Sequence, residues 1–313
     1  MVLRLRCGMV SPESYYIYIR ETETMFMGSV KDLETETQPT PNQLGEGLFK
    51  FTDSYSIFDW GRMPDRIDDK GRSLCTMGAF NFELLESEDI PTHYRGVVED
   101  GEIKELDDAT QPPKEMAIYL AHKPDLPYED GSYDYQAFHR ETGDTYLIPL
   151  EVVFRNSIPP ESSFRNRKTP GDIGLNIDRW PDGNCELPNP VVEYSTKLED
   201  KDRYLTIDEA RKISGLGDEL EKVRKVADRV NQVVTEYAQE SGFIHVDGKI
   251  ECVYHKGDVL VADVVGTFDE NRYRRSTSES STEATTNSGS RESREPRDKP
   301  TNVTSKTGVH SAT

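Results

Sequence analysis

Apolar residues recur with the spacing of one helical face in the last third of the chain, from about Asp218 onward. Those positions are Leu220, Val223, Val226, Ala227, Val230, Val233, Val234, Tyr237 and Ala238. Thr206 and Glu209 have the spacing of a capping box, and Gly242 stands where a C-terminal cap belongs. The pattern therefore predicts helical structure between residues 206 and 242, with one side facing a core.

Shorter apolar runs predict strands around this helix. The run LIPLEVVFRN at 147–156 is typical of a buried strand. FIHVDGKIECVY at 243–254 and VLVADVVGTF at 259–268 are separated by HKGD, which indicates a hairpin. Nearer the N-terminus, GLFKFTD and YSIFDW indicate short strands, and MGAFNFELLES has helical spacing. A small sheet with a helix is therefore expected before the longer strands.

Changes in composition divide the chain. Residues 1–26 differ in character from the segment that begins at Met27, so a misassigned start or a dispensable extension is expected there. Residues 96–146 are rich in Asp, Glu, Pro, Gly and Tyr, which predicts loops and short strands between better-defined elements. Residues 276–313 contain no aromatic and almost no aliphatic side chains. Such a segment cannot offset the entropy lost on ordering, so disorder is predicted.

Acidic residues outnumber basic ones 58 to 38, which gives a net charge of −20. Such a surface repels nucleic acid and anionic membranes. Because the charge is dispersed, it favours a solvated surface suited to a salty cytoplasm over an acidic interaction tail. No apolar run approaches the roughly 18 residues of a membrane span, and the first residues lack a signal-peptide core. A cytoplasmic location is therefore expected.

Cysteine and histidine give no pattern of metal binding. The four cysteines have no CxxC spacing, and the six histidines are equally scattered. Neither a zinc site nor a disulfide framework is indicated, and no histidine is assigned to a metal.

The sequence DGKIE, just before the predicted hairpin turn, carries the most informative polar pattern. Strand alternation puts Asp247, Lys249 and Glu251 on one face. If the turn is a three-residue loop with Gly257 left-handed, pairing brings Asp263 to the same face, where two carboxylates would suit Mg²⁺. A two-residue turn would put Asp263 on the opposite face. An exposed, charge-laced hairpin is the alternative.

Two further polar clusters suggest anion binding. Arg155 lies at the end of the predicted buried strand, and Ser162, Ser163 and Arg165 follow just beyond it. Their guanidinium and hydroxyl groups suit a phosphate monoester. A solvated basic loop is the alternative. The segment GSVKDL places a glycine and a lysine in a turn at 28–33, which is a weak signal because it matches neither a Walker motif nor GxGxxG.

The joint order of these segments resembles the SAICAR synthetase (phosphoribosylaminoimidazole-succinocarboxamide synthase) family between about Met27 and Arg272. The matching stretches are GSVKDL, TDSYSIFD, DDKG, IPLEVVFRN with the SS at 162–163, STK, DGKIE and ADVVGTFDENR. The resemblance implies a two-part α+β fold of the ATP-grasp and kinase-like kind, with antiparallel sheets and flanking helices. The ATP-binding part would span 27–146, and the part binding substrate and Mg²⁺ would span 147–275.

The resemblance also implies how nucleotide and metal are held. By their positions in the matching motifs, Gly28 and Lys31 would lie along the ATP phosphates, while Glu251 and Asp263 would hold Mg²⁺. Lys197, in STK, would approach the nucleotide or an acyl phosphate. ATP and Mg²⁺ are thus the implied cofactors.

A second set of residues is implied for the imidazole substrate. Asp247 and Lys249 would face the substrate, and Arg155, Ser162 and Arg272 would grip its 5′-phosphate. Together with the lysine of STK, Asp247 and Lys249 are the implied catalytic residues.

The implied activity is that of a ligase in purine biosynthesis. It joins L-aspartate to the carboxylate of carboxyaminoimidazole ribotide (CAIR) through an acyl phosphate, giving SAICAR, ADP and phosphate. A carboxylate is a poor electrophile and must be activated before an amine can attack it, which is the role of ATP. The implied partners are these small molecules, without nucleic acid or membrane; a homo-oligomer is compatible with the sequence but not indicated by it.

The chain departs from the family pattern in three places. Ser29 stands where many relatives carry a further lysine, and Glu161 takes the place of a glycine before the phosphate-binding serine. Disorder-promoting composition begins soon after Arg272, where relatives continue into helices. A frameshift or a recombined gene end is the hypothesis. The alternatives are a non-catalytic nucleotide- or phosphate-binding remnant of this fold, or a kinase acting on another small molecule.

Overall fold

The computed structural model describes residues 17–20, 23–27, 30–57 and 61–276, with side chains described from residue 30 onward. The predictions for Gly28, for most of the 1–26 extension and for the tail after Ser276 lie outside the described residues.

The N-terminal part is a seven-stranded sheet in which every neighbouring pair is antiparallel. In spatial order its strands are β1 (Ile17–Arg20), β2 (Glu23–Met27), β3 (Lys31–Thr37), β4 (Gly45–Phe51), β9 (Glu115–Leu120), β7 (Tyr94–Glu99) and β8 (Glu102–Lys104). Strand β9 lies inside the sheet between β4 and β7, and its Met116, Ala117 and Ile118 are buried. One of the short strands expected in 96–146 is therefore a central member of the core.

Helix α1 (Lys70–Ser87) packs on this sheet and confirms the helical spacing of MGAFNFELLES. It buries Leu74, Cys75, Phe82 and Leu85 along one side. The helix begins nearly two turns before the predicted segment, where its sequence is more polar. A hairpin of β5 (Ser54–Ile57) and β6 (Gly61–Arg66) precedes it.

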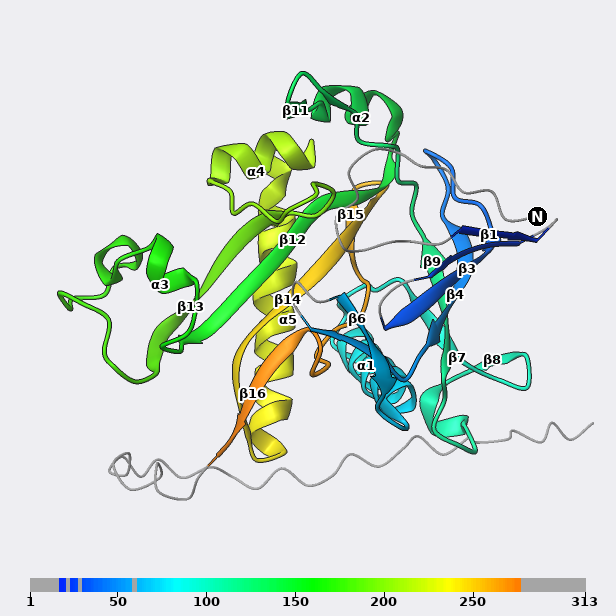
Figure 1. Cartoon of the computed structure of the whole chain (residues 1–313), viewed down its shortest axis with the longest axis horizontal. Helices are drawn as coiled ribbons and strands as arrows, with labels where there is room; N and C mark the ends of the chain where they lie inside the picture. Colours follow the sequence, from blue (N-terminus) through cyan, green and yellow to red (C-terminus); the bar gives the residue numbers. More distant parts are fainter. Residues whose placement is uncertain (1–16, 21–22, 28–29, 58–60, 277–313) are drawn as a thin grey trace, which may run out of the picture. The chain divides into compact units, whose positions relative to one another are not determined.

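The C-terminal part is a five-stranded antiparallel sheet covered on one face by a long helix (Figure 1). The strands run in the order β13 (Cys185–Thr196), β12 (Thr145–Ile158), β14 (Phe243–His255) and β15 (Asp258–Ala262), with β16 (Asn271–Arg275) also paired to β14. The predicted buried strand and hairpin are confirmed as β12 and β14–β15, but the second strand of the hairpin ends at Ala262 and not at Phe268. The fold is therefore α+β with antiparallel sheets, as expected.

The region predicted as helical contains two helices, α4 (Ile207–Ser214) and α5 (Leu220–Glu240). The capping box of Thr206 and Glu209 is present at the start of α4. Gly215 and Gly217 lie between the two helices and have φ of 74° and 54°. This left-handed backbone separates α4 from α5. Helix α5 then turns its apolar face to the sheet and buries Val223, Ala227 and others along it.

Short elements connect these parts. They are η2 (Leu106–Asp108), β10 (Tyr128–Glu129), β11 (Ser132–Tyr133), α2 (Tyr135–Glu141), α3 (Phe164–Arg167), η3 (Pro170–Ile173) and η4 (Gly217–Glu219). Among the described residues, no helix combines the length and the apolar character needed to cross a membrane.

The two sheets share one hydrophobic core. Phe82 and Ile118 from the N-terminal part belong to the same buried cluster as Leu150 and Val261 from the C-terminal part. The chain just before β7 also bridges to β15, since Val261 N donates to the carbonyl of Pro91 at 2.9 Å. The N-terminal and C-terminal sheets are therefore packed together.

Candidate functional site

One face of the C-terminal sheet is lined by charged side chains. The antiparallel register places Asp247 opposite Arg155, and Glu251 opposite Glu151. Lys249 lies between them on the same face because side chains alternate along a strand. The other face is apolar, with Phe154 and Ile250 buried in the core. The predicted alternation of DGKIE is therefore confirmed.

The turn between β14 and β15 decides between the two loop lengths that the sequence left open. The strand pairing leaves only two residues in the loop, Lys256 and Gly257, with φ of 50° and 100°. Of the two turn lengths left open by the sequence, the two-residue one is therefore found, with Lys256 and Gly257 in the left-handed conformations that such a hairpin turn demands. The register then sets Ala262 opposite Glu251, so a regular strand would send Asp263 to the other face.

Asp263 nevertheless joins the charged face. It comes directly after the last residue of β15 and has φ of 66°, so the strand geometry ends there. Its Oδ1 lies 2.5 Å from Nζ of Lys31, which is the first residue of β3 in the other sheet. Glu251 and Asp263 therefore lie on the same side, as the sequence predicted. The cause is the left-handed backbone at Asp263 and not a three-residue hairpin loop.

Three lysines and four carboxylates meet at this point in alternating ion pairs. This lysine–carboxylate cluster consists of Lys31, Lys197, Lys249, Glu151, Glu251, Asp263 and Glu270. Lys197 Nζ lies 2.6 Å from Glu251 and 3.6 Å from Glu151. Lys249 Nζ lies 2.9 Å from Glu151 and 3.2 Å from Glu270. The cluster carries one carboxylate more than it has ammonium groups.

Burial and mutual repulsion shift the pKa values of these carboxyl groups. Burial raises the pKa of Glu251 to about 7, with the neighbouring charge of Asp263 acting in the same direction against the attraction of Lys197. Burial also disfavours the charge of Asp263, but Lys31 and Lys197 outweigh it and lower the pKa of that group. Burial raises the pKa of Glu270 as well. Additional positive charge would therefore be favourable here.

The donor set fits Mg²⁺ bound together with a phosphorylated ligand. Mg²⁺ is usually held by one or two carboxylates, with phosphate oxygens and water completing its octahedron. Glu251 and Asp263 supply two carboxylates. Among the residues that the structure describes, no three His, Cys, Asp or Glu side chains are grouped as a self-sufficient metal site. The remaining ligands would have to come from substrate and solvent.

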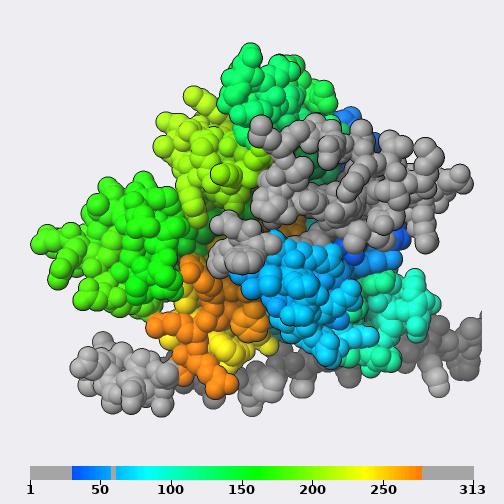
Figure 2. Space-filling model, viewed as in Figure 1, coloured from blue at the N-terminus to red at the C-terminus, as the bar shows by residue number. Residues whose placement is uncertain are grey.

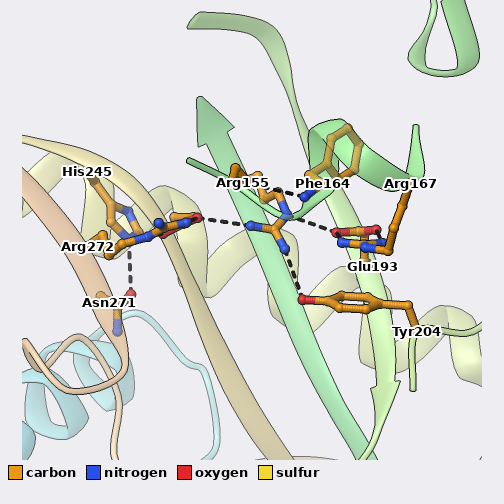
Figure 3. A network of polar contacts seen from close by, with 10 residues as sticks. Arg155, Phe164, Arg167, Glu193, Tyr204, His245, Asn271 and Arg272 are labelled. Carbon is orange, nitrogen blue, oxygen red and sulfur yellow. Dashed lines mark hydrogen bonds and ion pairs between the residues drawn. The ribbon is translucent and has the colours of Figure 1, made fainter. Parts of the chain in front are cut away.

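Next to this cluster, Asp247 binds the guanidinium groups of Arg155 and Arg272. Both arginines are labelled in Figure 3. Arg155 Nη1 donates to Asp247 Oδ2 at 3.0 Å, and Arg272 Nε donates to Asp247 Oδ1 at 2.7 Å. Arg155 also donates to Glu193 at 2.8 Å and to the Tyr204 hydroxyl at 3.2 Å. Its side chain is only 5% exposed, against 48% for Arg272. The two predicted arginines are together, but Arg272 is the accessible one.

Ser162 lies in the loop between β12 and α3 and is buried. Its Oγ accepts a hydrogen bond from the backbone N of Phe164 at 3.3 Å, which orders the start of α3. Its neighbour Glu161 lies close enough to Arg272 to act on it. The pKa of Arg272 is raised first by its hydrogen bond to Asp247 and additionally by the charge of Glu161.

Several polar residues of the site were missed from sequence. Glu151 lies four residues before Arg155 on β12, so strand alternation alone would have placed it on the same face. Glu193 on β13 pairs with both Arg155 and Arg167, at 2.8 and 2.6 Å. Glu270 lies outside any periodic pattern, so its pairing with Lys249 is a product of the tertiary fold.

The start of α1 also touches the loop before β16. Lys70 Nζ lies 2.6 Å from Asp269 Oδ2. Figure 2 shows the surface around α1, in blue, beside the orange surface of the last described residues. The loop that carries Glu270 is therefore held from the N-terminal part as well as by β14.

A buried histidine and asparagine hold the start of β16 beside Arg272 (Figure 3). His245 Nε2 lies 3.0 Å from Asn271 Oδ1. Gly248, on the neighbouring strand, leaves the space that the Asn271 side chain occupies. A Cβ at residue 248 would lie 1.8 Å from Asn271 Oδ1 and 2.6 Å from the ring of Phe154.

Gly248→Ala should therefore lower the free energy of unfolding by about 1–3 kcal/mol, the usual cost of overpacking a filled site. Gly183→Ala is the matched control, because nothing lies within 4 Å of a Cβ at that position. Chemical denaturation of both variants measures the difference. Equal stabilities of the two variants would show that Asn271 can move aside freely.

His93 links the N-terminal part to this site. Its Nε2 lies 3.1 Å from the carbonyl oxygen of Asp263, and the ring is buried between Phe49 and Phe82. Burial lowers the pKa of His93 to about 4, although its backbone hydrogen bonds oppose the shift. The imidazole is therefore neutral at neutral pH.

The depressed pKa of His93 predicts an acid-sensitive contribution to stability. Between about pH 6.5 and 4 the unfolded chain binds the proton and the folded chain does not, so stability is present above this window and lost below it. The loss from this group should be roughly 3 kcal/mol. The measurement is the pH dependence of unfolding free energy in the wild type minus that in His93→Gln. His122→Gln, at a partly exposed site, is the control for exchanging a histidine for glutamine elsewhere in the chain.

A family model described as SAICAR synthetase matches residues 28–292 of the chain. A protein of Archaeoglobus fulgidus, provisionally named a phosphoribosylaminoimidazole-succinocarboxamide synthase, is 41% identical over 256 residues, covering 79% of this chain and 74% of that protein. The synthase of that name from Thermoplasma acidophilum is 32% identical over 233 residues, covering 72% of this chain and 69% of its own length.

Solved structures share the fold. A SAICAR synthetase (type 2) in complex with ADP has a TM-score of 0.56 and 24% identity, covering 80% of this chain and 84% of that one. The SAICAR synthase from Saccharomyces cerevisiae complexed with SAICAR has a TM-score of 0.57 and 22% identity, covering 89% and 81%. At these identities the likeness establishes the arrangement of the two sheets and their helices.

Proposed function

Because the chain belongs to the SAICAR synthetase family, we propose that it joins L-aspartate to the carboxylate of CAIR with the hydrolysis of ATP to ADP and phosphate. The observation that carries the proposal is the lysine–carboxylate cluster lying beside Arg272 and Asp247. The names of the related proteins, and the ADP and SAICAR held by two structural neighbours, support the same reaction class.

In this proposal the lysine–carboxylate cluster receives the nucleotide phosphates. Lys31 and Lys197 would neutralise phosphate charge, and the matching motif assigns Gly28 to the same stretch. Glu251 and Asp263 would hold Mg²⁺, which supplies electrostatic stabilisation of the transferring phosphoryl group when it is bound. Their present ion pairs with the two lysines mean that these ammonium groups would shift toward the phosphates as metal and nucleotide enter.

The imidazole ribotide would bind on the same face of the sheet, next to the nucleotide phosphates. Asp247 and Lys249 would contact the imidazole, and the 5′-phosphate would bind at Arg155, Ser162 and Arg272. Because Arg155 and Ser162 are buried, Arg272 would make the direct contact, while Arg155 fixes Asp247 from behind. Arg272 is tied to Asp247, so the phosphate would compete with this carboxylate or share the guanidinium with it.

The chemistry proceeds in two displacements. A carboxylate oxygen of CAIR attacks the γ-phosphorus of ATP, and the bond to the β,γ-bridging oxygen breaks as ADP leaves. The amine of L-aspartate then attacks the acyl carbon, loses a proton, and expels phosphate. Lys31, Lys197 and Lys249 stabilise the negative charge that builds up during the first step, and the site holds the reactants in contact for the second.

Substrate-dependent ADP release tests the proposal. Release should require both L-aspartate and CAIR, and mass spectrometry should find SAICAR formed in equal amount. Release with CAIR absent would instead indicate a kinase acting on another molecule. Nucleotide binding without turnover would indicate a non-catalytic member of the family. The Glu251→Gln protein, purified in parallel, controls for contaminating ATPases.

A further inference from the structure

The backbone at Asp263 leaves the path of its strand in a way that the charged site requires. Since Ala262 lies opposite Glu251, continuation of β15 would point the next side chain away from the cluster. A φ of 66° is uncommon for residues that have a Cβ, although aspartate adopts it more readily than most. Here the left-handed turn directs the carboxylate to Lys31.

His93 makes a hydrogen bond to this turn. A carbonyl oxygen can only accept, so the contact at 3.1 Å requires Nε2 of His93 to carry the proton and to donate to the oxygen of Asp263. The backbone N of His93 also donates to the carbonyl of Val261 at 2.9 Å. His93 therefore donates hydrogen bonds to the backbone on both sides of Ala262.

The imidazole itself is fixed in orientation. It is buried, with the rings of Phe49 and Phe82 at 5.8 and 5.4 Å between centroids. Phe49 also lies 5.0 Å from Nζ of Lys31, the partner of the Asp263 carboxylate. The same aromatic side chain thus orders both the residue that holds the backbone of Asp263 and the residue that pairs with its carboxylate.

We propose that His93 is a positioning residue for Asp263, holding the left-handed turn that brings its carboxylate to the Glu251 side of the ribbon. The inference rests on the proposed function, in which Asp263 and Glu251 bind Mg²⁺ with the nucleotide. His93 acts on Asp263 through the backbone carbonyl, while Lys31 pairs with the carboxylate. Groups that orient metal ligands in this way commonly affect metal affinity.

The test compares three variants by the dissociation constant of ADP, measured calorimetrically with excess Mg²⁺ and again with EDTA. In the wild type Mg²⁺ should tighten ADP binding. His93→Phe keeps an aromatic ring but loses the donor, and the Mg²⁺ effect should fall on the order of tenfold while metal-free affinity is unchanged. His93→Gln, whose amide nitrogen reaches the place of Nε2, should retain the effect. The shorter His93→Asn should not.

An undiminished Mg²⁺ effect in His93→Phe would overturn the inference. So would equal losses in the Phe and Gln variants, because the hydrogen-bond donor that Gln keeps would then make no difference. If His93→Phe does not fold, the contrast between Gln and Asn decides the matter in the same way. If Mg²⁺ does not change the ADP affinity of the wild type, Asp263 does not bind the metal with the nucleotide, and this inference fails. The proposed function is tested separately, by SAICAR formation in the activity assay.

Discussion

Replacing Asp247 with alanine should lower the free energy of unfolding by about 3–5 kcal/mol, the usual cost of removing one partner from a buried ion pair. Asp247 is buried and binds Arg155 and Arg272 simultaneously. Without Asp247, the buried Arg155 guanidinium loses one of its two carboxylate partners. It keeps only Glu193 and the Tyr204 hydroxyl. Urea denaturation measures the change.

The matched control is an exposed pair on the same strand as Arg272. Arg274 pairs with Glu186 on β13, where the side chains are 45% and 61% exposed. Glu186→Ala should cost less than about 1 kcal/mol, as surface ion pairs do. If Asp247→Ala were as mild as this control, the buried guanidinium network would not be a source of stability. Asp247→Asn should fall between the two because it keeps the shape and part of the hydrogen bonding.

The elements that could be predicted from sequence are those in which one regular apolar face packs against the core. Helix α5 and strands β12 and β14 pack against each other, so their burial repeats regularly along the chain. Strand β9 was not recognisable as central, because only the short apolar run around Met116 marks it within a polar segment. The first turns of α1 likewise start on polar residues, without a side-chain cap at Asp69.

The site was predictable as far as strand alternation and motif order reach. Those signals found Asp247, Lys249 and Glu251, and the structure places them on one face. Strand alternation and motif order could not determine the length of the hairpin turn. Lys256 has a left-handed conformation there, which is not typical of lysine and cannot be predicted from the residue type. These signals could not reveal that Arg155 is enclosed, because its partners Glu193 and Asp247 arrive from two other strands.

Glu251→Gln should abolish most turnover while leaving the empty protein at least as stable as the wild type at pH 8. The loss of a carboxylate that would hold Mg²⁺ at the transferring phosphoryl group should lower turnover on the order of 100- to 1,000-fold. Stability responds in the opposite direction because burial raises the pKa of Glu251 from 4.5 to about 7. The folded protein therefore resists ionisation of this group more than the unfolded chain does.

The sign of this effect fixes a pH window. Between about pH 4.5 and 7 the folded state holds the proton more tightly, so the stability that Glu251 contributes is full below this window and is lost as pH rises through it. Glutamine resembles the protonated acid at every pH. The variant and the wild type should thus converge at acid pH, and the variant should gain relative to the wild type above pH 7, in metal-free buffer.

Glu46→Gln provides the control, since Glu46 lies on β4 with its side chain 42% exposed and should change stability by less than about 0.5 kcal/mol at either pH. A Glu251→Gln protein that is less stable than the wild type at pH 8 would mean that the ion pair with Lys197 outweighs the cost of burying the charge. The geometry of the site favours a Glu251→Gln protein that is at least as stable as the wild type at pH 8. Lys197 keeps Glu151 as a second partner, and the repulsion between Glu251 and Asp263 disappears with the substitution.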